Sequence, residues 1–248
     1  MLNRPVLPAV LLACCLALPV LLHAQPREGD TWQEPATGMV FVWVGGGVDK
    51  PNSGPIARDG YYGDDDPRSV PRVDGFWLGR CEVTQGQWRA VMGGNPSAFA
   101  KGDAYPVESV SLPEVQEFIA RLNASGSARF RLPTNREWSF AARSGGLPGE
   151  LARKAADKAA WHAGNSRGST HPVGSKAPDK LGLHDLSGNV RELCGDGGPA
   201  RPDDPLAGLA FCGGGWDDGP SGSQALGLAL GPPDARRNDV GLRLLREP

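Results

Sequence analysis

The 248-residue chain has 26 Lys and Arg against 28 Asp and Glu, a formal net charge of −2, and its basic residues form no long run. This balance excludes the strongly basic class of nucleic-acid-binding proteins. The 35 Gly and 23 Pro make up nearly a quarter of the chain, which is typical of a loop-rich protein. Seven tryptophans spread along the sequence argue for a packed core rather than disorder.

Residues 1–24 have the pattern of a secretory signal peptide. Arg4 precedes an apolar run that Pro19 interrupts, and the small residue Ala24 closes it. The mature protein is therefore expected to begin near Gln25, in the periplasm, after cleavage of the signal. The sequence around Cys14 also loosely resembles a lipobox, so a lipid-anchored form stays an open alternative.

Three cysteines lie beyond the signal: Cys81, Cys194 and Cys212. An exported protein meets an oxidising compartment, where thiols pair. Cys194 and Cys212 are the favoured pair because each adjoins a glycine-rich turn that permits close approach, and Cys81 would then be a free, buried thiol. Three pairings remain open on the sequence alone.

The first predicted elements after the signal are a flexible lead-in over residues 25–37 and a strand over 39–44 that stops at three glycines. A second strand-like segment covers 73–83. Residues 240–245 predict a final strand. Three helices each begin with a capping box, in which side chains satisfy free backbone N–H groups at the helix start. The pairs are Thr84 with Gln87, Ser111 with Glu114, and Thr134 with Glu137.

The segment 182–196 concentrates oxygen donors around a tight glycine turn. Asp185, Ser187 and Glu192 can supply side-chain oxygens, and the carbonyls of Gly188 and Val190 can supply more. Six to eight oxygens are what calcium requires. An ordinary surface turn is the alternative, because Ser-Gly-Asn is common loop chemistry.

Several motifs, taken in chain order, resemble the formylglycine-generating enzyme family, also called the sulfatase-modifying-factor family. The motifs are Met39–Val42, Glu82–Thr84, Pro106–Ser111, Arg131–Thr134, Glu137–Trp138, Ala141–Arg143, His171–Gly174, Gly182–Glu192, Gly213–Trp216 and Arg237–Arg243. The resemblance implies one α+β domain over residues 38–248, a variant of the C-type-lectin-like fold with little regular structure and with structural calcium.

The resemblance places the family's calcium loop on Asp185, Gly188, Val190 and Glu192. Asp185 stands where the family more often has Asn, which still supplies an oxygen. A second calcium site of the family would involve Asn165 and Ser166. We do not predict that site, because its acidic partner is missing before His171.

The catalytic motif of the family is altered. Active members bind copper(I) through two cysteines five residues apart, and Asp218 and Ser223 occupy those positions here. Oxygen donors do not replace thiolates as ligands of copper(I). We therefore expect no copper, no formylglycine formation and no catalytic residue, but an altered pocket made by Trp216, Asp217, Asp218 and Ser223.

These inferences predict a non-catalytic binding or regulatory module of the periplasm. Exported family members without the cysteine pair include accessory proteins of type VI secretion, so the resemblance implies action on a membrane threonine kinase that controls this system. The expected partner is the periplasmic part of such a kinase or an envelope lipoprotein, with peripheral outer-membrane association and without nucleic acid. The alternative is a divergent periplasmic oxidase or tailoring enzyme of the siderophore-chromophore maturation type. Direct sugar binding is a third interpretation, and the closed form of the loop 185–192 disfavours it.

Overall fold

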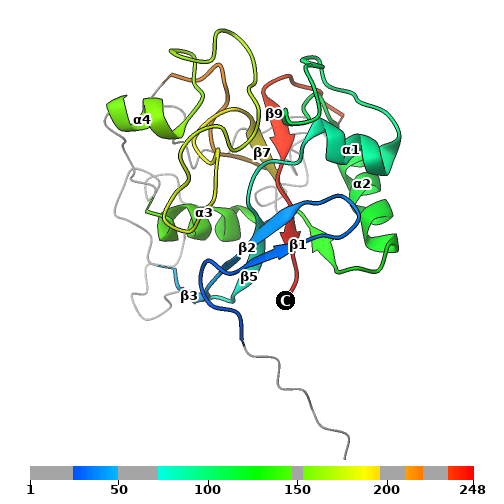
Figure 1. Cartoon of the computed structure of the whole chain (residues 1–248), viewed down its shortest axis with the longest axis vertical. Coiled ribbons are helices and arrows are strands. Elements are labelled where there is room, and N and C mark those ends of the chain that lie inside the picture. Colours follow the sequence, from blue (N-terminus) through cyan, green and yellow to red (C-terminus); the bar gives the residue numbers. More distant parts are fainter. Residues whose placement is uncertain (1–24, 50–71, 147–152, 196–209, 220–233) are drawn as a thin grey trace, which may run out of the picture.

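The computed structural model describes residues 25–49, 72–146, 153–195, 210–219 and 234–248 (Figure 1). The expected signal peptide and Ser223 lie outside these residues. The strands are β1 Thr31–Gln33, β2 Val40–Val44, β3 Gly47–Val48, β4 Arg72–Val73, β5 Phe76–Gly79, β6 Phe130–Arg131, β7 Arg191–Cys194, β8 Ala210–Cys212, β9 Val240–Leu242 and β10 Leu245–Arg246. The helices are α1 Gln85–Met92, α2 Leu112–Ala124, α3 Asn135–Ser144 and α4 Arg153–Ala159. In the described part of the chain, none of these helices has the length and apolar content that crossing a membrane requires.

A five-stranded antiparallel sheet forms the centre of the molecule, with the strand order β1-β2-β5-β10-β6. In Figure 1, α1 and α2 lie to one side of its central strands and α3 lies to the other. A second sheet has the order β8-β7-β9, with β7 parallel to β9 and antiparallel to β8. β3 and β4 pair separately. The fold is thus a single α+β domain with short elements, as the sequence predicts.

Both faces of the central sheet are buried, which explains why β2 is a continuous apolar run. Phe41 and Trp43 belong to the core cluster that contains Trp88 of α1 and Phe118 of α2. Val42 and Val44, which alternate with them along β2, belong to a second core cluster that contains Trp138 of α3. Successive side chains of a strand point to opposite faces, so a strand covered on both sides needs apolar residues at every position.

All three predicted capping boxes are present. The Thr84 and Thr134 hydroxyls accept from the backbone N–H of Gln87 and Glu137. At the start of α2, the Glu114 carboxylate accepts from the backbone N–H of Ser111 at 2.9 Å and from its hydroxyl at 2.8 Å. Each box satisfies N–H groups that have no partner inside the helix, and this local chemistry fixes where the helices begin.

Two predictions about the ends of the domain need correction. The lead-in over 25–37 is not simply flexible, because residues 31–33 pair with β2 as the edge strand β1. The final apolar segment is not one strand. It divides into β9 and β10, which belong to different sheets, and the fully buried Arg243 lies between them. The chain passes there from the second sheet to the central sheet. The guanidinium of Arg243 donates hydrogen bonds to the carbonyl of Gly79, at the end of β5, and to the carbonyl of His184.

A disulfide joins Cys194 on β7 to Cys212 on β8, with 18 residues of sequence separation. It is the pairing that the sequence favours. Cys81 is a free thiol. The bridge fixes the edge of the second sheet, and β7 carries the end of the oxygen-rich loop.

Candidate functional site

The loop that leads into β7 is held by two residues in left-handed backbone conformations, Asp185 (φ 60°) and Asn189 (φ 70°). Asn189 is fully buried and connects distant segments. Its amide nitrogen donates to Glu82 at 2.7 Å and to the carbonyl of His171 at 3.1 Å, while its amide oxygen accepts from the His171 N–H at 2.9 Å. Asn and Asp tolerate this conformation better than most residues, which explains their place in the turn.

Glu192 lies at the centre of a buried ion pair. Its carboxylate accepts from Arg243 Nε at 2.9 and 3.0 Å, from a terminal guanidinium nitrogen of Arg243 at 2.6 Å, and from Trp138 Nε1 at 2.6 Å. The side chains of Glu192 and Arg243 are 1% and 0% exposed. Charge-assisted bonds of this kind are strong where water is excluded. Glu192 was predicted from the sequence as a site residue, whereas Arg243 was not.

Two further carboxylates lie close to this pair, so the buried cluster has an excess of acid. Asp185 accepts from the Gly174 N–H at 2.6 Å, and Glu82 accepts from the Val190 N–H at 2.9 Å. Burial raises the pKa of Asp185 and raises the pKa of Glu82 well above its ordinary value; the charges of Asp185 and Glu192 add to the second shift. Arg243 thus forms its ion pair with Glu192 and acts on Asp185 and Glu82 through its charge alone.

Two oxygens of this cluster have no hydrogen-bond partner within the described residues. They are Oδ1 of Asp185 and Oγ of Ser187, both buried. Buried polar atoms are normally satisfied, so these two fit the presence of a further group. Hard oxygen donors suit calcium, which Asp185 with the turn carbonyls of Gly188 and Val190 would hold. Glu192 already accepts from Arg243 and Trp138, and among the described residues no three His, Cys, Asp or Glu side chains converge as a metal group. Calcium therefore stays a prediction.

Gly188 is required by packing, whether or not a cation binds. A Cβ atom there would lie 2.2 Å from the carbonyl oxygen of Trp161 and 2.9 Å from its nitrogen. We expect Gly188→Ala to lower the free energy of unfolding by about 1–3 kcal/mol, because backbone must move to admit the methyl group. Urea denaturation measures the change. Gly219→Ala is the control, since no atom of the described residues lies within 4 Å of a Cβ there. Equal stabilities of the two variants would contradict this packing role.

The altered pocket is a network of ion pairs. Arg191 contacts the carboxylates of Asp218 and Asp239, and that of Asp217 at 3.3 Å. The second oxygen of Asp218 accepts from the Gly215 N–H at 2.8 Å. One oxygen of Asp218 therefore binds Arg191 on β7, and the other binds the backbone of its own turn.

Trp216 completes this region. Its indole N–H donates to the carbonyl of Asn238 at 3.0 Å, and its ring meets Phe99 edge-on at 5.5 Å. The predicted pocket residues Trp216, Asp217 and Asp218 thus lie in one turn, and Ser223 is outside the described residues. The donor at position 218 is a hard oxygen engaged by Arg191, which does not fit copper(I).

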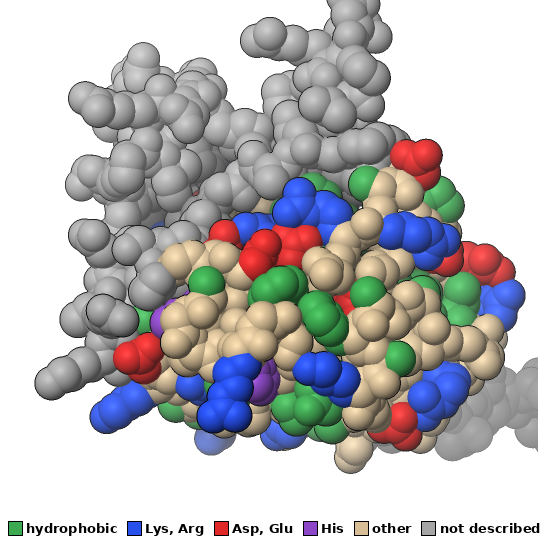
Figure 2. All heavy atoms as spheres, turned by 90° about the horizontal axis from the view of Figure 1, so that it is seen from above, with side chains coloured by type: hydrophobic (Ala, Val, Ile, Leu, Met, Phe, Trp, Pro, Cys, Tyr) green, Lys and Arg blue, Asp and Glu red, His purple; other side chains and the backbone are tan. Residues whose placement is uncertain are grey.

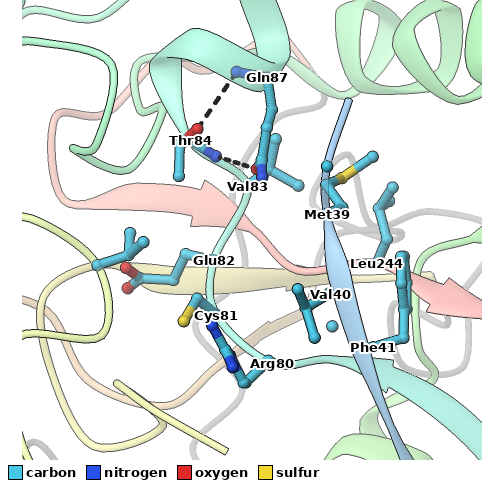
Figure 3. A pocket seen from close by; sticks show the side chains of 13 residues that line it. Met39, Val40, Phe41, Arg80, Cys81, Glu82, Val83, Thr84, Gln87 and Leu244 are labelled. Carbon is cyan, nitrogen blue, oxygen red and sulfur yellow. Dashed lines mark hydrogen bonds between the residues drawn. The ribbon is translucent and has the colours of Figure 1, made fainter. Parts of the chain in front are cut away.

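A separate cavity of about 130 Å³ lies beside β2 and the segment that follows β5. Figure 3 shows Cys81 and Glu82 on one wall and Met39, Phe41 and Leu244 on the other. Burial raises the pKa of the Cys81 thiol to about 11, so the thiol is protonated at neutral pH. Because thiolate is the reactive form, Cys81 is not poised as a nucleophile.

The family described as the sulfatase-modifying factor enzyme 1-like (FGE-sulfatase) domain matches residues 28–248. The chain belongs to this family. Among curated proteins, this FGE-like chain is similar to the chaperone protein LppX of Paenibacillus barcinonensis, with 31% identity over 172 residues that cover 48% of this chain and 61% of LppX. The match thus spans about three fifths of that relative's length.

Solved structures share the fold. Variable protein 1 of Treponema denticola superposes with a TM-score of 0.69 and 23% identity, and the match covers 88% of this chain and 99% of that one. PvdO from Pseudomonas aeruginosa superposes with a TM-score of 0.69 and 22% identity, and the match covers 90% of this chain and 100% of PvdO. CarF superposes with a TM-score of 0.66 and 24% identity, and the match covers 86% of this chain and 99% of CarF. At these identities the likeness establishes the FGE-like fold alone.

Proposed function

We propose that this FGE-like protein is an exported, calcium-stabilised binding module that regulates a partner in the cell envelope. One observation supports this role above others: Asp218, at the position where active members have a copper-binding cysteine, is bound on both oxygens by Arg191 and Gly215. A carboxylate held in this way stabilises a turn and is not free for acid–base chemistry. Position 218 therefore serves the structure of the loop.

The partner that we propose is the periplasmic part of a membrane threonine kinase controlling type VI secretion, or an envelope lipoprotein. The similarity to a protein named as a chaperone supports a role in binding other proteins. Loops held on a rigid base, as residues 161–190 are by Asn189 and Glu82, suit partner recognition.

The test is affinity capture from detergent-solubilised envelope in the presence of calcium. The full chain, expressed from its complete reading frame and purified as the cell processes it, is the bait, and mass spectrometry identifies what is retained. We expect a kinase or an envelope lipoprotein to be retained by folded bait and lost with bait unfolded in urea. An empty capture, together with a small molecule that copurifies at Trp216 and Asp218, would instead support the tailoring enzyme.

A further inference from the structure

Three basic side chains lie near a stacked aromatic pair, Trp161 and His171, in the loops between α4 and β7. The rings of Trp161 and His171 are nearly parallel, at 9°, with their centroids 3.6 Å apart. Lys176 Nζ lies 4.0 Å from the centroid of Trp161. Since His171 fills one face of the indole, Lys176 covers the other. Both faces of Trp161 are thus occupied, and the ring is not available for stacking on a sugar.

The other two cations are Lys101 and Arg167. Arg167 follows Ser166, whose carbonyl accepts from Nε2 of His171 at 2.7 Å, so this segment lies beside the aromatic pair. Burial lowers the pKa of His171, and the charges of Lys101, Lys176 and Arg167 lower it further. Lys101 Nζ donates to the hydroxyl of Ser169 at 2.5 Å. Lys176 Nζ donates to the backbone carbonyl of Asp157, also at 2.5 Å. We call Lys101, Arg167 and Lys176 with the aromatic pair the basic patch.

Within the described residues, none of these three cations forms an ion pair with a carboxylate, unlike the arginines of the neighbouring acidic cluster. Figure 2 views the molecule from above and shows a histidine between two basic groups and, apart from them, an acidic cluster beside further basic side chains. Among the described residues, no carboxylate therefore neutralises the positive charge of the basic patch.

The backbone at Arg167 supplies a second, independent observation. Arg167 is exposed and has a φ of 58°, in the left-handed region that disfavours residues with a long side chain. Glycine would adopt this conformation without strain, as Gly168 does next to it at 76°. A strained, exposed arginine is expected where the guanidinium itself has a use.

We propose that the basic patch is the docking surface for an acidic peptide segment of the partner protein. This inference rests on the binding role proposed above and names the chemistry that the partner presents. Carboxylates would pair with Arg167, Lys101 and Lys176, and Arg167 offers the bidentate geometry that carboxylates prefer.

A short peptide fits this face better than a membrane or a long polyanion. The Ser166 hydroxyl donates to the carbonyl of Trp216 at 2.8 Å, so the basic patch adjoins the turn that carries Asp217 and Asp218. A flat anionic surface laid over the basic patch would also meet this turn and be repelled, because the three carboxylates of Asp217, Asp218 and Asp239 have only two arginine partners, Arg191 and Arg237, among the described residues. A peptide segment can contact the three cations alone.

The experiment uses a fluorescein-labelled deca-glutamate peptide, with deca-glutamine as the neutral control. Binding to the full chain is followed by fluorescence anisotropy at low and moderate salt. We expect the chain to bind deca-glutamate in a salt-dependent way and Arg167→Gly to weaken binding by about threefold to tenfold, as does Lys176→Gln. The melting temperature of Arg167→Gly should equal or exceed that of the wild type, because glycine relieves the strained φ.

Arg129→Gln is the matched control. Arg129 is also a highly exposed arginine, but it pairs with Glu247 beside the C-terminus, at the far end of the molecule (Figure 1). We expect this variant to bind deca-glutamate as the wild type does. Equal affinities of the wild type and Arg167→Gly would overturn the proposal, and so would binding to phosphatidylglycerol vesicles without binding to deca-glutamate.

Affinity capture separates this inference from the binding role. If Arg167→Gly retains the same envelope protein as the wild type, the basic patch is wrong while the binding role stands. If the wild type retains no envelope protein but Arg167→Gly still weakens deca-glutamate binding, the basic patch stands and the regulatory role fails.

Discussion

Replacing Glu192 with alanine is expected to lower the free energy of unfolding by about 3–5 kcal/mol. Glu192 and Arg243 are almost completely buried, and the carboxylate accepts from both Arg243 and Trp138. The substitution leaves the guanidinium buried without its counter-charge, and water cannot compensate for the loss. Urea denaturation in the presence of a chelator measures the effect of the ion pair without calcium.

Glu117→Ala is the control for this prediction. Glu117 pairs with Arg121 one helical turn away, and both side chains are about half exposed. Pairs of this kind contribute about 0.3–0.5 kcal/mol, because water screens them and holding the side chains costs entropy. A loss in Glu192→Ala no larger than in Glu117→Ala would show that the buried pair does not stabilise the fold.

Melting of the wild type and of Asp185→Ala, with calcium and with chelator, tests the predicted calcium site. A ligand that binds only the folded state raises stability by about 2.7 kcal/mol at one hundred times its dissociation constant. The wild type should therefore melt higher with calcium than with chelator. Asp185→Ala should lose this difference, because it removes the unpartnered Oδ1, while the ion pair of Arg243 and Glu192 remains. A wild type that melts alike in both buffers would refute the calcium site and leave the ion-pair prediction intact.

The second large effect concerns the disulfide. Replacing both Cys194 and Cys212 with alanine is expected to lower the free energy of unfolding by about 3 kcal/mol, the value for a closed loop of this length. The bridge restricts the unfolded chain and fixes the pairing of β7 with β8. Denaturation in non-reducing buffer measures the loss.

Cys81→Ala provides the comparison, because Cys81 is a free thiol and is only partly buried. We expect a markedly smaller change than in the double variant. Non-reducing peptide mapping should recover a linked peptide containing Cys194 and Cys212, with Cys81 reduced. Recovery of Cys81 in a disulfide would contradict the pairing.

The sequence determined the features that depend on neighbouring residues. The capping boxes at Thr84, Ser111 and Thr134 could be read directly, since donor and acceptor lie three positions apart and meet as soon as a helix turn forms. The apolar run of β2 likewise predicted a strand. The order of the motifs was sufficient to identify the family, because it spans nearly the whole chain.

Only the tertiary structure decided how the site is arranged. Arg243 reaches Glu192 across 51 residues, and Asn189 reaches Glu82 across 107. No spacing in the sequence reveals such pairs, because they depend on which strands lie side by side. The same holds for Arg191 and Asp218, and for the cations around Trp161 and His171. The sequence contains the charged groups, but packing determines which of them form ion pairs with one another and which do not.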